Sequence, residues 1–269
     1  MNGGPDTSRD GLVRPDWENV SRQRKMRILL LGGTSEAREI AHSLSRERDV
    51  EVSVSLARSE RLAHCFDCPV RIGGWGGEAA YRDHLVRERI DAVIDATHPF
   101  ADEMGRRTAR IAHALGIVAL RFMRPPWIPQ DQDNWTFLDN PEDAARHIPA
   151  SATVFLATGR RDMDRFANLD PRRVLCRVRE KPETEAPFKH GSYLVLHGPV
   201  SVAQEIGTFE ELGVDWIITR NSGGQGGWPK LAAARALGIP VAMIRRPPPA
   251  DLPCIDAVDE ALNWVRSRV

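Results

Sequence analysis

The chain has 269 residues, in which 37 lysines and arginines balance 37 aspartates and glutamates. This neutral balance predicts neither a basic stripe for nucleic acid nor a patch for an anionic membrane surface. Its apolar runs have strand lengths, well short of the roughly 20 residues of a membrane helix. The length allows one large domain or two modest lobes, and we expect a cytoplasmic protein that binds neither nucleic acid nor membrane.

Residues 1–26 are polar and contain no apolar core of the signal-peptide kind, so we interpret them as a flexible extension outside the fold. Four cysteines are too few for a disulfide framework in a chain of this length. Cys65 and Cys68 form a C-x-x-C pair, but a zinc site needs a second pair, and Cys176 and Cys254 stand alone. We therefore predict no metal site.

In the first half of the chain, β-rich runs alternate with amphipathic segments of helical length, which indicates an α/β fold with a parallel sheet. The expected strands are 27–31, 50–57, 91–96 and 117–122, and the expected helices are 35–46, 78–89 and 101–115. Residues 124–150 are rich in proline and polar residues. We interpret them as a passage between lobes with a short helix near 141–148.

The alternation resumes in the second half. The expected strands are 152–158, 173–179, 192–198, 215–220 and 240–245, and the expected helices are 201–212, 228–237 and 256–267. We therefore predict two Rossmann-like, doubly wound lobes with mainly parallel sheets, residues 27–123 and 151–269, and an interlobe cleft. Ligands of such folds bind beyond the carboxyl ends of the strands, so the residues that follow strands are the site candidates.

A glycine loop joins the first strand to the first helix. Aligned with G-x-G-x-x-G/A, the sequence GGTSEA has Gly32 at the tight turn, Thr34 in place of the second glycine and Ala37 at the third. The hydroxyls of Thr34 and Ser35 can donate to a phosphate, and a helix N-terminus offers free N–H groups. The loop predicts diphosphate binding, with an ordinary strand-to-helix turn as the alternative. Its cofactor-binding candidates are Gly32, Gly33, Thr34, Ser35, Glu36 and Ala37.

The second strand ends in Ala57, Arg58 and Ser59 rather than in the acidic residue that binds the ribose 2′-hydroxyl of NAD. An arginine followed by a hydroxyl suits a 2′-phosphate, so Arg58 and Ser59 favour NADP. A surface arginine at the start of a loop is the alternative.

The sequence DATHPFA places Asp95, Thr97 and His98 where a strand ends, before Pro99 prevents simple continuation. A hydroxyl and an imidazole at this position can reach a nicotinamide or a substrate edge. His98 is a candidate to donate a proton or a hydrogen bond, and Thr97 to contact the cofactor. A capped turn is the alternative.

Two strand ends in the second half are also polar and rich in glycine. TGRR at 158–161 follows one strand, and RNSGG at 220–224 follows another. Such loops form anion-binding concavities, and arginine binds carboxylates through paired hydrogen bonds. They either complete the cofactor site or bind substrate carboxylates, whereas each charge taken alone is typical of a solvated surface. The candidates are Arg124, Arg160, Arg161, Arg220, Asn221, Ser222, Gly223, Gly224 and Lys230, and Arg245 and Arg246 also lie at a strand end.

Four motifs carry a family resemblance: GGTSEAR at 32–38, DATHPFA at 95–101, RPPW at 124–127 and NSGG at 221–224. Their order and spacing resemble those of the precorrin-6A reductase family (CbiJ/CobK type) of cobalamin biosynthesis, and the resemblance extends from about Arg27 to Arg268. One departure is Arg220, where lysine is usual. The charge is kept, but a planar guanidinium group replaces a flexible ammonium group.

The resemblance implies an NADPH-dependent oxidoreductase that reduces one carbon–carbon double bond of precorrin-6A to give precorrin-6B. The acetate and propionate groups of this macrocycle would explain the strand-end arginines, and His98 becomes a candidate proton donor or orienting group. Neighbouring pathway enzymes are expected as transient partners. Whether the substrate already carries cobalt stays open, as does the choice between Gly32–Ala37 and Asn221–Gly224 for the cofactor diphosphate.

Two other functions fit the same motifs. One is an NADP-dependent reductase of another carboxylate-rich small molecule, and the other is a non-catalytic, NADP-sensing regulator. A sensor needs no second polar array that faces the cofactor, so the arginine-rich loops favour an enzyme.

Overall fold

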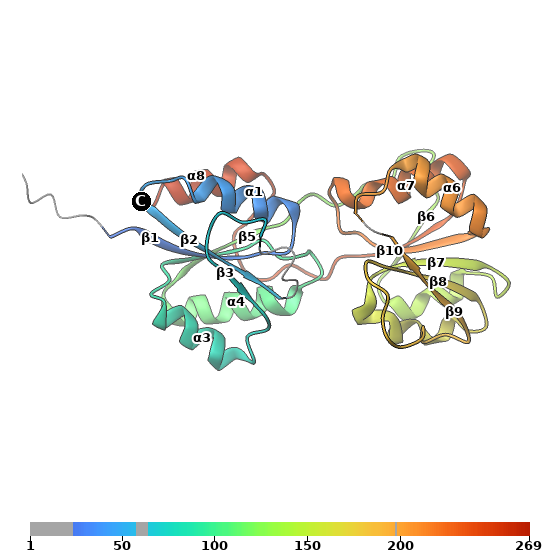
Figure 1. Cartoon of the computed structure of the whole chain (residues 1–269), viewed down its shortest axis with the longest axis horizontal. Coiled ribbons are helices and arrows are strands. Elements are labelled where there is room, and N and C mark those ends of the chain that lie inside the picture. The colour runs from blue at the N-terminus through green and yellow to red at the C-terminus, as the bar shows by residue number, and fades with distance from the viewer. Residues whose placement is uncertain (1–23, 58–63, 197) are drawn as a thin grey trace, which may run out of the picture.

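The computed structural model describes residues 24–57, 64–196 and 198–269. They form two lobes that lie side by side along the long axis of the molecule, each with a parallel sheet between helical layers (Figure 1). The predicted α/β class with two mainly parallel sheets is confirmed. The cleft predicted between the lobes stays a prediction. Among the described residues, no helix is both long and apolar enough to cross a bilayer.

The N-terminal lobe has a six-stranded sheet in the order β12-β5-β4-β1-β2-β3. Its strands are β1 (Met26–Leu31), β2 (Val50–Leu56), β3 (Val70–Ile72), β4 (Ala92–Asp95), β5 (Val118–Phe122) and β12 (Cys254–Ile255). Its helices are α1 (Ser35–Leu44), α3 (Glu78–Arg87), α4 (Asp102–Leu115) and α8 (Val258–Arg266). Helices α1 and α8 cover one face of the sheet, and α3 and α4 cover the other (Figure 1).

The C-terminal lobe repeats this order as β6-β11-β10-β7-β8-β9. Its strands are β6 (Trp135–Leu138), β7 (Thr153–Ala157), β8 (Arg173–Val178), β9 (His190–Val195), β10 (Trp216–Arg220) and β11 (Val241–Ile244). Its helices are η2 (Pro141–Asp143), α5 (Ala144–His147), η3 (Arg160–Leu169), α6 (Val202–Leu212), η4 (Gln225–Gly227) and α7 (Trp228–Leu237). The two α-helices α6 and α7 lie together on one face (Figure 1).

Central strands carry the core of each lobe. Every residue of β4 and of β11 is buried, because parallel strands with helices on both faces have no solvent-exposed side. The helices add apolar stripes at spacings of three and four residues, such as Ala37, Ile40, Ala41 and Leu44 of α1. This packing leaves the ends of the strands as the places where polar side chains can gather.

Each lobe takes its sixth strand from a segment that crosses between the lobes. Strand β6 lies within the predicted passage 124–150 but pairs with β11, and Trp135 is in register with Val241. Strand β12 belongs to the predicted C-terminal lobe, yet it pairs with β5 of the N-terminal lobe. Helix α8 follows it and packs on α1. The sheets therefore divide the chain differently from the predicted boundaries, because two short strands pair with residues distant in sequence.

Candidate active site at the seam between the lobes

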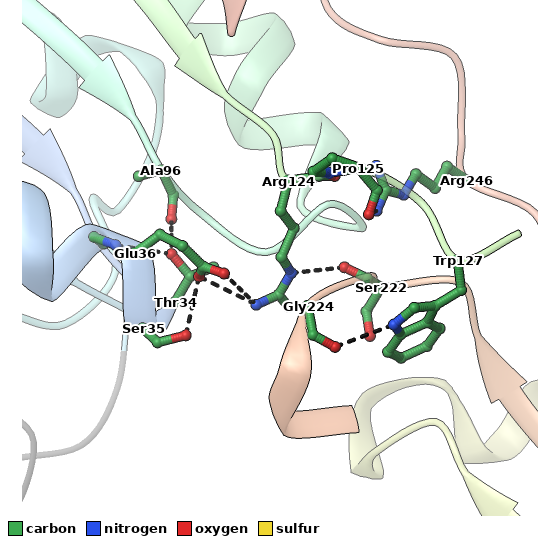
Figure 2. A network of polar contacts seen from close by, with 11 residues as sticks. Thr34, Ser35, Glu36, Ala96, Arg124, Pro125, Trp127, Ser222, Gly224 and Arg246 are labelled. Atoms are coloured by element: carbon green, nitrogen blue, oxygen red, sulfur yellow. Dashed lines mark hydrogen bonds and ion pairs between the residues drawn. The ribbon is translucent and has the colours of Figure 1, made fainter. Parts of the chain in front are cut away.

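Most of the predicted site residues follow the strands at which each sheet reverses its order; Arg124, which follows β5, and Lys230, within α7, are exceptions. In the N-terminal lobe these strands are β1 and β4, and in the C-terminal lobe they are β7 and β10. A crevice forms where the connections from two such neighbouring strands run to opposite faces of the sheet. The loops from the two lobes meet at a seam, where Arg124 contacts Glu36 of one lobe and Ser222 of the other (Figure 2).

The glycine loop after β1 is held by close packing. The backbone N–H of Gly32 donates to the Ser55 carbonyl at 2.9 Å. A Cβ at Gly32 would lie 2.9 Å from a terminal methyl group of the buried Leu56, so a larger residue here would displace that side chain. Gly33 has a φ of +150° and is exposed, and its nearest neighbours are backbone atoms of Thr97 and His98. The glycine loop and the loop after β4 therefore lie side by side, as the site prediction requires.

Thr34 caps helix α1. Its Oγ1 accepts the backbone N–H of Ala37 at 3.1 Å and donates to the Ala96 carbonyl at 3.0 Å (Figure 2). The hydroxyl is thus already committed, which differs from the expectation that it donates to a phosphate. The backbone N–H groups of Ser35 and Glu36 lie in the first turn and have no intrahelical acceptor. They remain the donors that this helix can offer to an anion.

A buried ion pair underlies the loop after β4. Asp95 is fully buried, and its Oδ1 accepts both the N–H of Thr97 at 3.1 Å and its hydroxyl at 2.6 Å. Its Oδ2 lies 3.4 Å from Nη1 of Arg121, which is only 2 % exposed. Gly105 of α4 makes room for this arginine, because a Cβ there would lie 1.7 Å from Nη1. The pair fixes Asp95, and Asp95 in turn orients Thr97.

The His98 ring lies between this loop and the cations of the other lobe. Its Nδ1 accepts the backbone N–H of Phe100 at 3.3 Å, so the proton of the neutral ring is on Nε2. Burial and then the charge of Arg220 lower the pKa of His98 to about 3, with smaller contributions from Arg124, Arg246 and Lys230. His98 is therefore uncharged at neutral pH in this state of the protein.

Cations from the C-terminal lobe line the seam. Arg220 lies 5.2 Å from the centre of the Phe100 ring and 3.4 Å from Asp162. Lys230 is buried, donates to the Gly227 carbonyl at 2.7 Å and has a pKa lowered to about 7, first by burial and then by the charge of Arg177. An excess of positive charge in a partly buried place favours ligands with several negative groups.

The loop after β10 is pinned to the passage between the lobes. The Asn221 side chain exchanges two hydrogen bonds with the backbone of Trp127, at 2.8 and 2.9 Å. The Trp127 indole donates to the Gly224 carbonyl at 3.1 Å (Figure 2). A Cβ at Gly223 would lie 2.1 Å from the Pro125 carbonyl oxygen. The RPPW and NSGG motifs thus pack against each other, and Asn221 and Gly223 serve this packing.

Two arginines complete the seam. Arg124 donates from Nε to the Ser222 carbonyl at 2.7 Å and from Nη1 to the two Glu36 oxygens at 3.2 and 3.4 Å. Arg246 donates to the Asn221 carbonyl and to the Arg124 carbonyl, each at 2.8 Å. Burial, followed by the charge of Arg124, lowers the pKa of Arg246 to about 10. The chain crosses between the lobes after β5, at Arg124, and after β11, at Arg246. Both crossings are therefore hydrogen-bonded to the loop after β10.

Four predicted site residues remain: Arg58, Ser59, Arg160 and Arg161. Arg58 and Ser59 lie outside the described residues. Arg160 and Arg161 are exposed at the start of η3, and burial, with a smaller contribution from the charge of Arg161, lowers the pKa of Arg220.

Sequence reasoning missed a set of buried ionic residues behind the site. They are Arg121, which pairs with Asp95, and Glu205, which pairs with the partly buried Arg177; Gly105 makes room for Arg121. Sequence signals existed for two of them, because an arginine within an apolar strand and a glycine inside a helical pattern both call for a packing reason.

The fold and the site together define a two-lobed α/β protein in which a glycine loop and a helix N-terminus face a cationic loop. A family model described as Precorrin-6x reductase CbiJ/CobK matches residues 27–266. The chain belongs to this family and is an oxidoreductase, so the resemblance stated from the motifs is confirmed.

Individual relatives cover nearly the whole chain. A precorrin-6A reductase of Rhodococcus erythropolis is 41% identical over 241 residues, which are 89% of this chain and 97% of the relative. One of Mycobacterium tuberculosis is 39% identical over 243 residues, with coverage of 89% and 97%. A solved structure of CobK precorrin-6A reductase superposes with a TM-score of 0.82 at 32% identity, and covers 90% of this chain and 97% of that one.

Proposed function

We propose that this protein reduces one carbon–carbon double bond of precorrin-6A with NADPH to give precorrin-6B, a step of cobalamin biosynthesis. One observation carries the proposal: a glycine loop with free N–H donors faces a group of cations across the seam, on a chain of the precorrin-6x reductase family. The first feature suits a diphosphate, and the second suits a substrate with many carboxylates.

The N-terminal lobe fits the cofactor. Gly33 has no side chain, is exposed and borders the loop of Thr97 and His98, so the backbone allows close approach of a phosphorylated ligand. The N–H groups of Ser35 and Glu36 would hold the diphosphate, and Thr97 would contact the nicotinamide end. Bound there, NADPH supplies the hydride, and the protein contributes orientation and electrostatics.

The C-terminal lobe fits the substrate. Three basic side chains lie near the seam and act on His98. They are Arg220 at the end of β10, Arg246 after β11 and Lys230 in α7. Burial lowers the pKa of each of them by disfavouring the charged form, and Lys230, with a pKa of about 7, is only partly protonated at neutral pH. Acetate and propionate groups of the macrocycle would supply the missing negative charge.

His98 then has a role that depends on its charge. In the unliganded protein it is neutral, so it can donate one hydrogen bond from Nε2 but cannot act as a cationic acid at neutral pH. Substrate carboxylates that neutralise the surrounding cations would remove only the smaller, electrostatic part of this lowering, because burial is its largest cause. We therefore favour a role for His98 in orienting the bound ligand over a role as proton donor.

The test is a reductase assay with purified protein, NADPH and precorrin-6A, followed by the loss of NADPH absorbance and by mass spectrometry of the product. We expect one NADPH consumed for each macrocycle that gains two hydrogens. NADPH oxidation with another polycarboxylate but not with precorrin-6A would favour a different reductase. Binding of NADPH without any oxidation would contradict an enzymatic function.

A further inference from the structure

The ion pair between Glu36 and Arg124 links α1 to the first crossing between the lobes (Figure 2). Charge-assisted hydrogen bonds are usually about 2.7–2.9 Å long. The two contacts from Nη1 to Glu36 measure 3.2 and 3.4 Å, whereas the bond from Nε to Ser222 is 2.7 Å long. Arg124 is therefore held firmly by the C-terminal lobe and loosely by Glu36.

The position of the guanidinium does not depend on Glu36. A Cβ at Gly224 would lie 2.8 to 3.1 Å from three side-chain atoms of Arg124, so the arginine lies directly against this glycine. The Arg124 carbonyl is fixed by the bond from Arg246. If the Glu36 carboxylate moved away, these contacts would keep the guanidinium in place with Nη1 free.

Charge gives a reason for Glu36 to stay while no ligand is bound. Arg124 lies near Arg246, which donates to its carbonyl, and the charge of Arg124 adds to burial in lowering the pKa values of Arg246 and Lys230. The side chains of Glu36 and Arg124 are 20% and 15% exposed, so solvent screens their attraction only in part. A carboxylate in this position lowers the repulsion among the cations.

The position of Glu36 makes it a competitor for ligands. It is the second residue of α1, and its backbone N–H is one of the two free donors at this helix N-terminus. Its side chain turns toward Arg124, with Ser35 donating to Oε2 at 3.0 Å (Figure 2). An anion that reaches the helix N-terminus or the cations therefore meets this carboxylate.

We propose that Glu36 is a placeholder anion, whose carboxylate neutralises Arg124 until a phosphate or carboxylate group of a ligand displaces it from Nη1. The inference rests on the proposed function only for the identity of that ligand. It assigns the Glu36 side chain, as distinct from its backbone N–H, to a group that leaves when the ligand arrives. It also makes Arg124 a preorganised anion receptor.

The test measures the binding of anions to Glu36→Gln, with inorganic pyrophosphate and NADP as phosphate probes and uroporphyrin as a carboxylate probe. Removal of a competing carboxylate predicts tighter binding by roughly two- to fivefold, the effect of a partly exposed ion pair. A gain for pyrophosphate and NADP assigns Arg124 to the cofactor, and a gain for uroporphyrin alone assigns it to the substrate. Both outcomes support the placeholder.

Two controls separate displacement from a general change in charge. Glu39→Gln removes an exposed carboxylate of the same helix and is expected to change binding less than about twofold. In an Arg124→Met background, the change Glu36→Gln should give no further gain. Unchanged or weaker binding by Glu36→Gln, an equal gain in the Arg124→Met background, or no binding of any probe by either protein would overturn the inference. The proposed function fails separately, if NADPH is not oxidised with precorrin-6A.

Discussion

The two lobes share one strand order but place opposite charges at equivalent points. Asp95 ends β4, and Arg220 ends β10, the strand in the corresponding position of the second sheet. The neighbouring strand decides what each charge does. Asp95 is in register with Arg121 of β5, and the two form a buried ion pair. Arg220 is in register with Ile244 of β11, which offers no counter-charge, and its ion pair is instead with the partly exposed Asp162 of η3.

The difference shows how one scaffold comes to hold two kinds of site. In the N-terminal lobe the strand-end charge is neutralised internally, and it orients the loop of Thr97 beside the glycine loop. In the C-terminal lobe the strand-end charge faces the seam, next to Phe100 and His98. On the assignment proposed above, the first lobe holds the cofactor and the second holds the acids of the substrate.

The largest effect is expected from Gly105→Ala in the N-terminal lobe. The new methyl group would lie 1.7 Å from Nη1 of Arg121 and would break the pair with Asp95, at a cost of about 3 kcal/mol in the free energy of unfolding. Urea denaturation measures this loss. The matched control is Gly207→Ala in α6, where a Cβ meets nothing within 4 Å, and there we expect a gain of about 0.5–1 kcal/mol. Similar values for the two variants would show that Arg121 does not need the glycine.

The next effect concerns the C-terminal lobe and appears in kinetics. Arg220→Gln removes a seam cation, so KM for precorrin-6A should rise about tenfold while KM for NADPH stays within about twofold. The matched control is Arg173→Gln. Arg173 is the first residue of β8, at the end of the parallel sheet opposite to Arg220, so its loss should alter neither KM value. If KM for NADPH rose instead, the result would indicate that the C-terminal lobe binds the cofactor and the N-terminal lobe the substrate.

The next comparison is between two helix N-caps, one in each lobe. Thr34 caps α1, and Ser201 caps α6 in a capping box. Thr34→Ala and Ser201→Ala should each destabilise the protein by about 1 kcal/mol in urea. Only Thr34→Ala should also raise KM for NADPH, because its hydroxyl joins the glycine loop to Ala96. Equal KM values in the two variants would argue against a cofactor at α1.

The smallest effect is a pH dependence. The pKa of His98 is about 3 in the folded protein and near its ordinary value of 6.5 in the unfolded chain. Between these values the unfolded chain binds a proton that the folded protein does not, so stability falls as the pH drops. Relative to His98→Gln, the wild type should lose up to about 1 kcal/mol of unfolding free energy by pH 5.5. Parallel pH profiles of the two proteins would show that His98 is not buried among cations.

The local parts of the fold were predictable from the sequence, and the long-range parts were not. The expected strand 173–179 and helix 228–237 are present as β8 and α7, because both carry clear local patterns. Strands β3, β6 and β12 were missed, since they have two to four residues and β12 pairs with a strand more than a hundred residues away. Periodicity carries no information about such a partner.

The same limit applies to the site. The motifs placed Gly33, Thr97, His98 and Arg220 at strand ends, and the structure brings these loops together at the seam. The sequence did not reveal that the Thr34 hydroxyl is used by Ala37 and Ala96, or that Asn221 binds the backbone of Trp127. From the sequence alone, both side chains are expected to be free to bind a ligand. Their partners Ala96 and Trp127 are distant in sequence, so only the structure shows that these side chains are already used.

The most direct test of the account is a crystal structure with NADP bound. We predict the diphosphate against the N–H groups of Ser35 and Glu36, beside Gly33, with the arginines of the C-terminal lobe left for the substrate. A diphosphate bound instead at the Asn221–Gly224 loop would contradict this division of labour between the lobes.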